Sequence, residues 1–183
     1  MGRDTVARLK GYVPIEDIFN FVREKYDKCA TMTLTDTKIG LIKDKDFIKE
    51  SYGKSQYWHS YTGNINFKND ETYRNIFYSY NNVNSYENLE HYSEYGLEDM
   101  VKSETTFISL GCFGNSKDII ESITKHFGGW FDADDCDGEP YVFIGQNADS
   151  DIKPVVKVTM QDIYDKFGAT VVIVDNPYAP HRN

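Results

Sequence analysis

The chain is poor in the residues that build several common functional sites. Its three cysteines, Cys29, Cys112 and Cys136, are too widely spaced for a CxxC zinc motif or a disulfide framework. This usage is typical of a reducing cytoplasm, where we expect the protein to act. The four histidines show neither HExxH nor another metal-ligand spacing. We therefore predict that the protein carries no cofactor.

Long apolar runs and an excess of basic residues are also missing. No stretch approaches the ~20 apolar residues that a membrane-spanning helix needs, and the polar N-terminal sequence does not resemble a signal peptide. The 20 basic and 29 acidic residues give a net charge of −9. Nucleic acids and anionic membranes attract clustered cations, so neither is an expected direct partner. A basic protein, including one that itself binds nucleic acid, is compatible with this charge.

What the chain does contain predicts an α+β fold with a largely antiparallel sheet and helices on one side. Pro14 and the apolar spacing that follows it indicate a helix over 14–27. Asn115 and Asp118 predict a capped helix that ends at Gly128. A further helix is expected from Thr159. The predicted strands are 4–13, 29–35, 38–43, 57–67, 72–81, 105–113, 130–134, 140–145 and 169–175.

The order of these elements suggests two parts, residues 1–104 and residues 105–183. The second part reads β-α-β-β-α-β, the ferredoxin-like order, and its last strand, 169–175, is apolar enough to be central. The first part begins in a similar order, so a degenerate duplication is possible. In it, 29–35 and 38–43 are predicted to be joined by a turn at Asp36-Thr37. One continuous sheet through both parts is equally compatible with the sequence.

The middle of the chain is unusually rich in tyrosine. Nine of the fourteen tyrosines lie between Tyr52 and Tyr95, with eight asparagines and five serines. We expect a β-hairpin over 57–81 here. Such a mixture is typical of protein-binding surfaces, although aromatic residues also suit an ordinary sheet. The predicted contact residues are Tyr57, Trp58, Tyr61, Tyr78, Tyr80, Tyr86, Tyr92 and Tyr95.

One acidic segment is a weak candidate for a cation site. Its carboxylates are Asp132, Asp134, Asp135, Asp137 and Glu139. Hard cations prefer such oxygen ligands, but with Gly138 at the sixth position of an EF-hand loop, Ala133 and Ile144 stand where carboxylates are required. A solvated acidic turn between two strands is the simpler interpretation, and no metal is predicted.

These observations favour a non-catalytic acidic protein that binds another protein and occupies its surface. A residue usage rich in Lys, Asn, Ile, Tyr and Asp is typical of AT-rich phage and mobile elements, so an inhibitor of a host system, acting in the host cytoplasm, is the specific hypothesis. A self-assembling structural component of the virion type is the first alternative, and homo-oligomers are possible. A small metal-dependent enzyme that handles phosphate is the second.

Overall fold

The structure is a computed structural model that describes eight ranges of the chain. These ranges are 4–42, 57–69, 74–81, 97–103, 105–111, 114–132, 141–145 and 170–174. In five segments only the backbone is described: 35–42, 57–61, 81, 101–102 and 170–174. The helix predicted from Thr159 lies outside the described residues.

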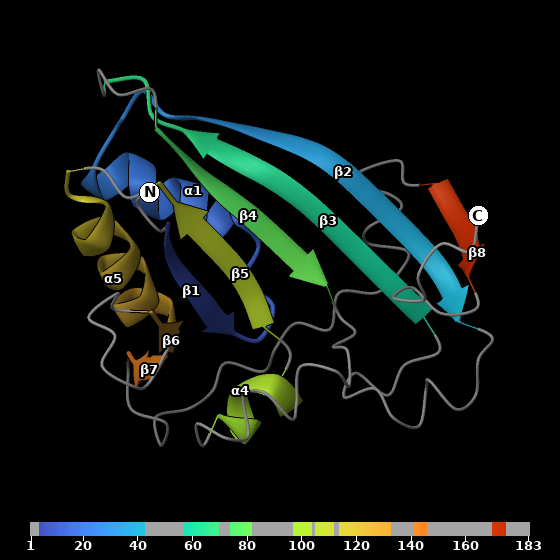
Figure 1. Ribbon diagram of the computed structural model, residues 1–183. Coiled ribbons are helices and arrows are strands. Elements are labelled where there is room, and N and C mark those ends of the chain that lie inside the picture. Colours follow the sequence, from blue (N-terminus) through green and yellow to red (C-terminus); the bar gives the residue numbers. More distant parts are fainter. Residues whose placement is uncertain are drawn as a thin grey trace.

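The described residues form eight strands and three helices (Figure 1). The strands are β1 (Thr5–Lys10), β2 (Thr31–Ile42), β3 (Tyr57–Asn66), β4 (Asn75–Asn81), β5 (Thr105–Leu110), β6 (Gly129–Phe131), β7 (Val142–Ile144) and β8 (Thr170–Val174). The helices are α1 (Ile15–Lys25), α4 (Glu98–Lys102) and α5 (Ser116–Phe127). The helix predicted over 14–27 therefore corresponds to α1, and the one that ends at Gly128 corresponds to α5.

All eight strands belong to one sheet in the order β7-β6-β1-β5-β4-β3-β2-β8. Every neighbouring pair is antiparallel except β2 and β8, which are parallel. The predicted α+β class and the largely antiparallel sheet are confirmed. The predicted hairpin also forms, because β3 and β4 pair directly from Ser60–Asn81 to Asn66–Asn75.

The predicted ferredoxin-like C-terminal half is not confirmed, and neither is the duplication. A ferredoxin-like half would be a sheet of its own, whereas β1 from the N-terminal part lies between β5 and β6. The last strand, β8, pairs with β2 at the far end of the sheet. The strand that looked central by its apolar sequence is thus at the edge of the described sheet.

The predicted turn at Asp36-Thr37 does not form. Residues 31–42 are one long strand, and its register with β3 shifts between Leu34 and Asp36. A β-bulge of this kind takes up one extra residue without reversing the chain. Neither Gly nor Pro stands at positions 36–37, so no residue there forces a tight reversal.

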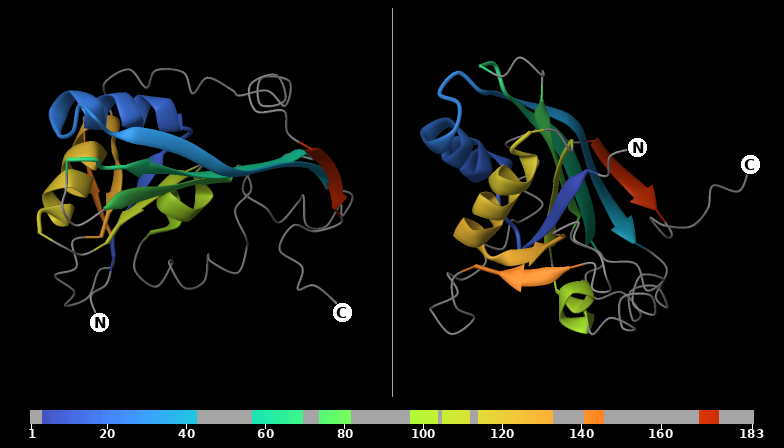
Figure 2. Two further views of the ribbon diagram at one scale, coloured as in Figure 1. Left: turned by 90° about the horizontal axis from the view of Figure 1, so that it is seen from above. Right: turned by 60° about the vertical axis from the view of Figure 1, so that its left-hand side comes forward.

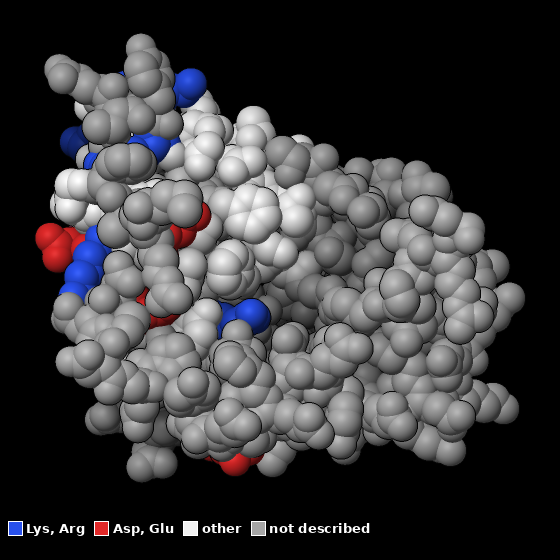
Figure 3. All heavy atoms as spheres, viewed as in Figure 1, with Lys and Arg blue, Asp and Glu red and all other residues white. Residues whose placement is uncertain are grey.

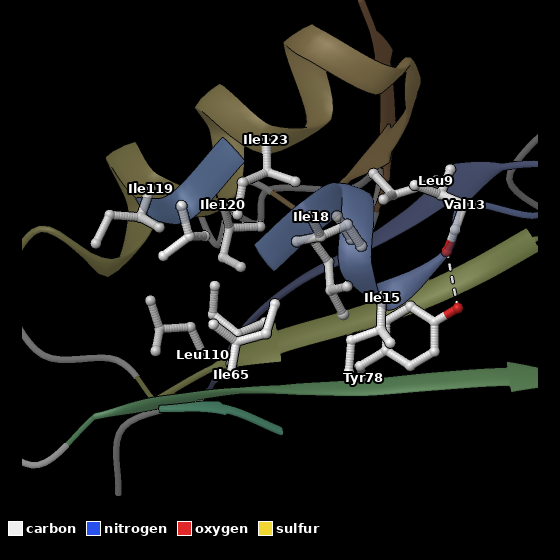
Figure 4. Close-up of a cluster of buried hydrophobic side chains, with 14 of the residues drawn as sticks. Leu9, Val13, Ile15, Ile18, Ile65, Tyr78, Leu110, Ile119, Ile120 and Ile123 are labelled. Carbon is white, nitrogen blue, oxygen red and sulfur yellow. Dashed lines mark hydrogen bonds between the residues drawn. The ribbon is translucent and has the colours of Figure 1, made fainter. Parts of the chain in front are cut away.

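The two longer helices cover one face of the sheet, as predicted, but α4 lies on the other (Figure 2). Ile15, Ile18 and Val22 form the buried stripe of α1, at the spacing of successive helical turns. In α5 the corresponding residues are Ile119, Ile120 and Ile123. These two stripes belong to one hydrophobic core with inward-facing residues of β1, β3, β4 and β5 (Figure 4).

The ends of the helices depart from simple capping. Pro14 is the N-cap residue of α1, and its carbonyl accepts the amide N–H groups of Asp17 and Ile18. Asn115 is the N-cap residue of α5, but its side chain makes no capping hydrogen bond. Its Oδ1 instead accepts a hydrogen bond from Nη1 of Arg74 at 2.7 Å. The capping arrangement predicted for Asn115 is therefore wrong in its side-chain contact.

A glycine in β3 makes room for a side chain from the first turn of α1. A Cβ atom added to Gly63 in β3 would lie 2.7 Å from Cδ1 of Ile15 and 2.6 Å from the carbonyl oxygen of Thr33. Real Cβ atoms do not approach other atoms so closely. The absence of a side chain at this position lets the first turn of α1 pack directly on the sheet.

Candidate functional site

Two of the tyrosines predicted to face a partner lie in the core instead. Tyr78 and Tyr80 belong to β4 and are 0% and 1% exposed. Alternation along the strand places them on the same face as Ile76, which is also fully buried. The prediction that these two tyrosines form an exposed surface is therefore wrong. Ile76 shares this face, but the opposite face carries the equally apolar Phe77, so alternation alone does not identify the buried side.

The side chains of the other six predicted contact residues are not described. Three lie in β3, where the structure gives only the backbone: Tyr57, Trp58 and Tyr61. Three lie outside the described residues: Tyr86, Tyr92 and Tyr95. Their part in binding stays a prediction.

The acidic segment is described only at its first residue. Asp132 follows β6, is half-buried, and donates its backbone N–H to the carbonyl oxygen of Val6 at 3.1 Å. The other carboxylates, Asp134, Asp135, Asp137 and Glu139, lie outside the described residues. Among the residues that the structure does describe, no three His, Cys, Asp or Glu side chains are grouped closely enough to hold a metal ion.

The sheet face turned away from α1 and α5 carries a different set of aromatic side chains. Arg8 in β1 lies opposite Phe107 in β5 and opposite Trp130 in β6, so the three form one row across the sheet. Trp130 is buried against α4 and contacts Phe143 of β7 with ring centroids 5.1 Å apart. Further along the sheet, Phe77 of β4 is 37% exposed and Phe143 is 38% exposed.

Contacts between rings and cations join these side chains. Phe77 and Phe107 meet edge to face, with ring centroids 6.3 Å apart. The guanidinium carbon of Arg8 lies 5.5 Å from the centre of the Phe107 ring. Towards the β7 edge, the ammonium nitrogen of Lys10 lies 6.0 Å from the centre of the Phe143 ring. We call Arg8, Lys10, Phe77, Phe107 and Phe143 the aromatic–cation strip.

The positive charge of the strip has no anionic partner within the described part of the chain. No described carboxylate forms an ion pair with Arg8 or Lys10. Nε of Arg8 is buried and has no hydrogen-bond acceptor. A buried donor left without an acceptor costs about 1–3 kcal/mol, so such groups are uncommon in proteins. The strip is a locally positive surface on a chain whose net charge is −9.

The neighbourhood of the strip is partly covered and partly open. Between Phe143 and Arg8, α4 contributes Leu97 and Met100 to a buried cluster with Trp130 and Val6. Figure 3 views the molecule from the side of α4 and shows uncharged side chains exposed over β4 and β5, with a basic side chain at the lower end of this area. The area over β4 and β5 is therefore mainly uncharged and includes the exposed ring of Phe77, with acidic atoms visible only at its border.

The chemistry of the strip suits contact more than catalysis. Its groups are phenyl rings and cations, which can stack, bury apolar surface and hold an anion. Sequence reasoning missed this surface because it followed tyrosine content. Alternation in β4 and β5 places Phe77 and Phe107 on one face, but nothing in the sequence indicates that this face is turned outward.

No described helix is long and apolar enough to cross a membrane. Comparisons with protein-family models, with curated proteins and with solved structures found no match to this chain.

Proposed function

We propose that this chain is a non-catalytic binding protein that recognises another protein through the aromatic–cation strip. The observation that carries the proposal is the exposure of Phe77 and Phe143, each more than a third, beside two cations without a described anionic partner. Aromatic residues and Arg are enriched where proteins bind one another, and exposed apolar patches often mark such sites.

The specific role that we propose is inhibition of a host system by a protein of phage or mobile-element origin. Its support is the Lys-, Asn-, Ile-, Tyr- and Asp-rich composition and a strip suited to occupying a partner's surface. Action in a reducing cytoplasm fits the sparse cysteines, of which Cys29 is an exposed free thiol. Tyr86, Tyr92 and Tyr95 stay part of the proposed contact set, on the composition of their segment alone.

Self-assembly is a second candidate because one observation favours it. The edge strand β7 exposes Val142 by 49% and Phe143 by 38%. Exposed apolar edge strands can pair with a further strand, from a second copy or from another protein. A strand of only three residues offers few backbone hydrogen bonds, so we place this candidate after the strip.

The proposal is tested by comparing the partners captured by the wild type with those captured by Phe77→Ser. Phe19→Ser is the matched control. Phe19 is a half-buried ring on the helix side and also lies beneath an arginine, with 5.4 Å between the Arg23 guanidinium carbon and its ring centre. We expect both variants to remain folded, with the larger loss of stability in Phe19→Ser because Phe19 packs against the core. Only Phe77→Ser should lose a partner that the wild type captures from lysate and that cross-links to β4 or β5.

Two outcomes would contradict the proposal. In the first, Phe77→Ser is folded and keeps every partner that the control keeps. In the second, Phe77→Ser unfolds, which would make Phe77 a structural residue. Light scattering of the purified wild type separates the two candidates, because a defined oligomer that Phe143→Lys dissociates would favour self-assembly.

A further inference from the structure

We infer that the aromatic–cation strip takes an acidic peptide segment of the partner, with a carboxylate placed against Arg8 and an apolar side chain against Phe77. The inference rests on the proposed function and adds the chemistry of the ligand. It also differs from the expectation drawn from net charge, which favoured a basic partner. At physiological ionic strength charges more than about 8 Å apart are largely screened, so the local charge of the strip decides what binds there.

The unpaired cations are the first argument. Arg8 is half-buried, and its guanidinium lies over Phe107 while no described carboxylate pairs with it. A guanidinium stacked on a ring keeps its edge available for hydrogen bonds in the ring plane. A carboxylate fits that edge with two parallel hydrogen bonds, which are among the strongest in proteins. Lys10 adds a second positive charge. It follows Arg8 by two residues in β1 and therefore occupies the next position on the same face.

The rings supply the second argument. Phe77 is 37% exposed and supported from the side by Phe107. Phe77 is in β4 and Arg8 is in β1, with β5 between these two strands. Along the strand direction the two residues are offset by one position on the same face. With strands about 4.8 Å apart and about 6.8 Å between same-face residues, Arg8 and Phe77 are separated by roughly 12 Å. In an extended peptide two side chains four positions apart match this separation, at about 13 Å.

Single-stranded nucleic acid is the other ligand with similar chemistry, because bases stack on sheet aromatics. A nucleic acid strand presents one phosphate per nucleotide and requires a path of cations along its backbone. The described strip offers two cations, on a chain of net charge −9. One or two carboxylates match the strip better than a polyanion does.

Titration of the isotope-labelled full chain with short peptides tests the inference. The probe is a blocked nine-residue Gly/Ser peptide with Glu and Phe four positions apart. Its controls are the same peptide with Gln in place of Glu, one with Lys in place of Glu, and a thymidine oligonucleotide of equal length. We expect the Glu peptide to shift the amide signals of β1, β4 and β5, and to bind about tenfold more tightly than the Gln peptide.

Arg8→Met supplies the matching change in the protein, with Arg23→Met as control because Arg23 also lies over a phenyl ring. Arg8→Met should reduce the affinity for the Glu peptide about tenfold, and Arg23→Met should not change it. If Arg8→Met fails to fold, the comparison of Glu and Gln peptides on the wild type still decides.

Three results would overturn the inference: equal binding of the Glu and Gln peptides, no saturable shift with millimolar Glu peptide, or tighter binding of the oligonucleotide. The proposed function fails separately. A natural partner lost by Phe77→Ser, together with no preference for Glu over Gln, would leave the binding function standing and remove only the acidic ligand.

Discussion

At the scale of single residues, buried hydroxyl groups explain why tyrosine and threonine occupy core positions. The hydroxyl of Tyr78 donates to the carbonyl oxygen of Val13 at 2.8 Å. Thr106 Oγ1 accepts the N–H of Val13 and donates to the carbonyl oxygen of Gly11, each at 2.9 Å. These bonds pair the buried backbone between β1 and α1, which has no strand or helix partner of its own.

Tyr78→Phe should therefore lower the free energy of unfolding. The substitution keeps the ring but leaves the Val13 carbonyl without this donor, at a cost of about 1–2 kcal/mol. Urea denaturation with matched slopes measures the change. Tyr26→Phe is the control, because Tyr26 is half-buried and its hydroxyl has no hydrogen bond to a described residue. Equal loss in both variants, or none in either, would contradict the assigned role of Tyr78.

At the scale of elements, one carboxylate joins the end of α1 to the end of β3. Asp27 is only 3% exposed. Its two oxygens accept hydrogen bonds from the backbone N–H groups of Cys29, Lys68 and Asn69 and from the side-chain amide of Asn69, at 2.6–3.0 Å. The end of α1, which packs on one face of the sheet, is thus hydrogen-bonded to the backbone that follows β3.

Replacing this carboxylate tests the connection between the two elements. Asp27→Ala should destabilise the fold by about 2–3 kcal/mol, since several buried donors lose a charged acceptor. Hydrogen exchange of the Lys68 and Asn69 amides should become faster. Asn69→Ala removes only the side-chain donor and should cost less. An Asp27→Ala protein with wild-type stability and unchanged exchange at both amides would show that the connection is not needed.

The sequence predicted those elements whose pattern is local. The positions of Ile15, Ile18 and Val22 are enough to predict α1 and its buried side. Alternation in β4 also separates Ile76, Tyr78 and Tyr80 from Phe77, but it does not say which set faces the core. Side-chain polarity would place the tyrosines outside and Phe77 inside, and the reverse is found. Tyr78 has a buried hydrogen bond and Tyr80 a ring partner, whereas the more apolar Phe77 faces outward.

At the scale of the whole molecule, the arrangement of the strands joins distant parts of the chain. β1 pairs with β5 from Thr5–Leu110 to Lys10–Thr105 and with β6 at Ala7–Phe131. β1 and β5 are about 100 residues apart in the sequence. The alternation of side chains along a strand is the same whichever strand lies beside it, so the sequence does not indicate that these two strands pair. The ferredoxin-like prediction failed for this reason, because it chose partners close in sequence.

A fragment of residues 105–183 should therefore not fold alone. Without β1, the facing edges of β5 and β6 have no partner, and the helix α5 loses part of its core. We expect narrow amide dispersion in NMR spectra of this fragment and recovery of dispersion when the fragment of residues 1–104 is added. A well-dispersed, cooperatively unfolding fragment of residues 105–183 would contradict this expectation.

The position of β1 also affects how the protein is made. Residues 5–10 leave the ribosome before both of their neighbours, of which one ends at residue 110 and the other at residue 131. The nascent chain must carry this strand, with its alternating apolar side chains, unpaired while about 100 further residues are made. Slowing elongation upstream of residue 105 would lengthen that exposure, and a holding chaperone should bind nascent chains at residues 5–10 until β5 and β6 emerge.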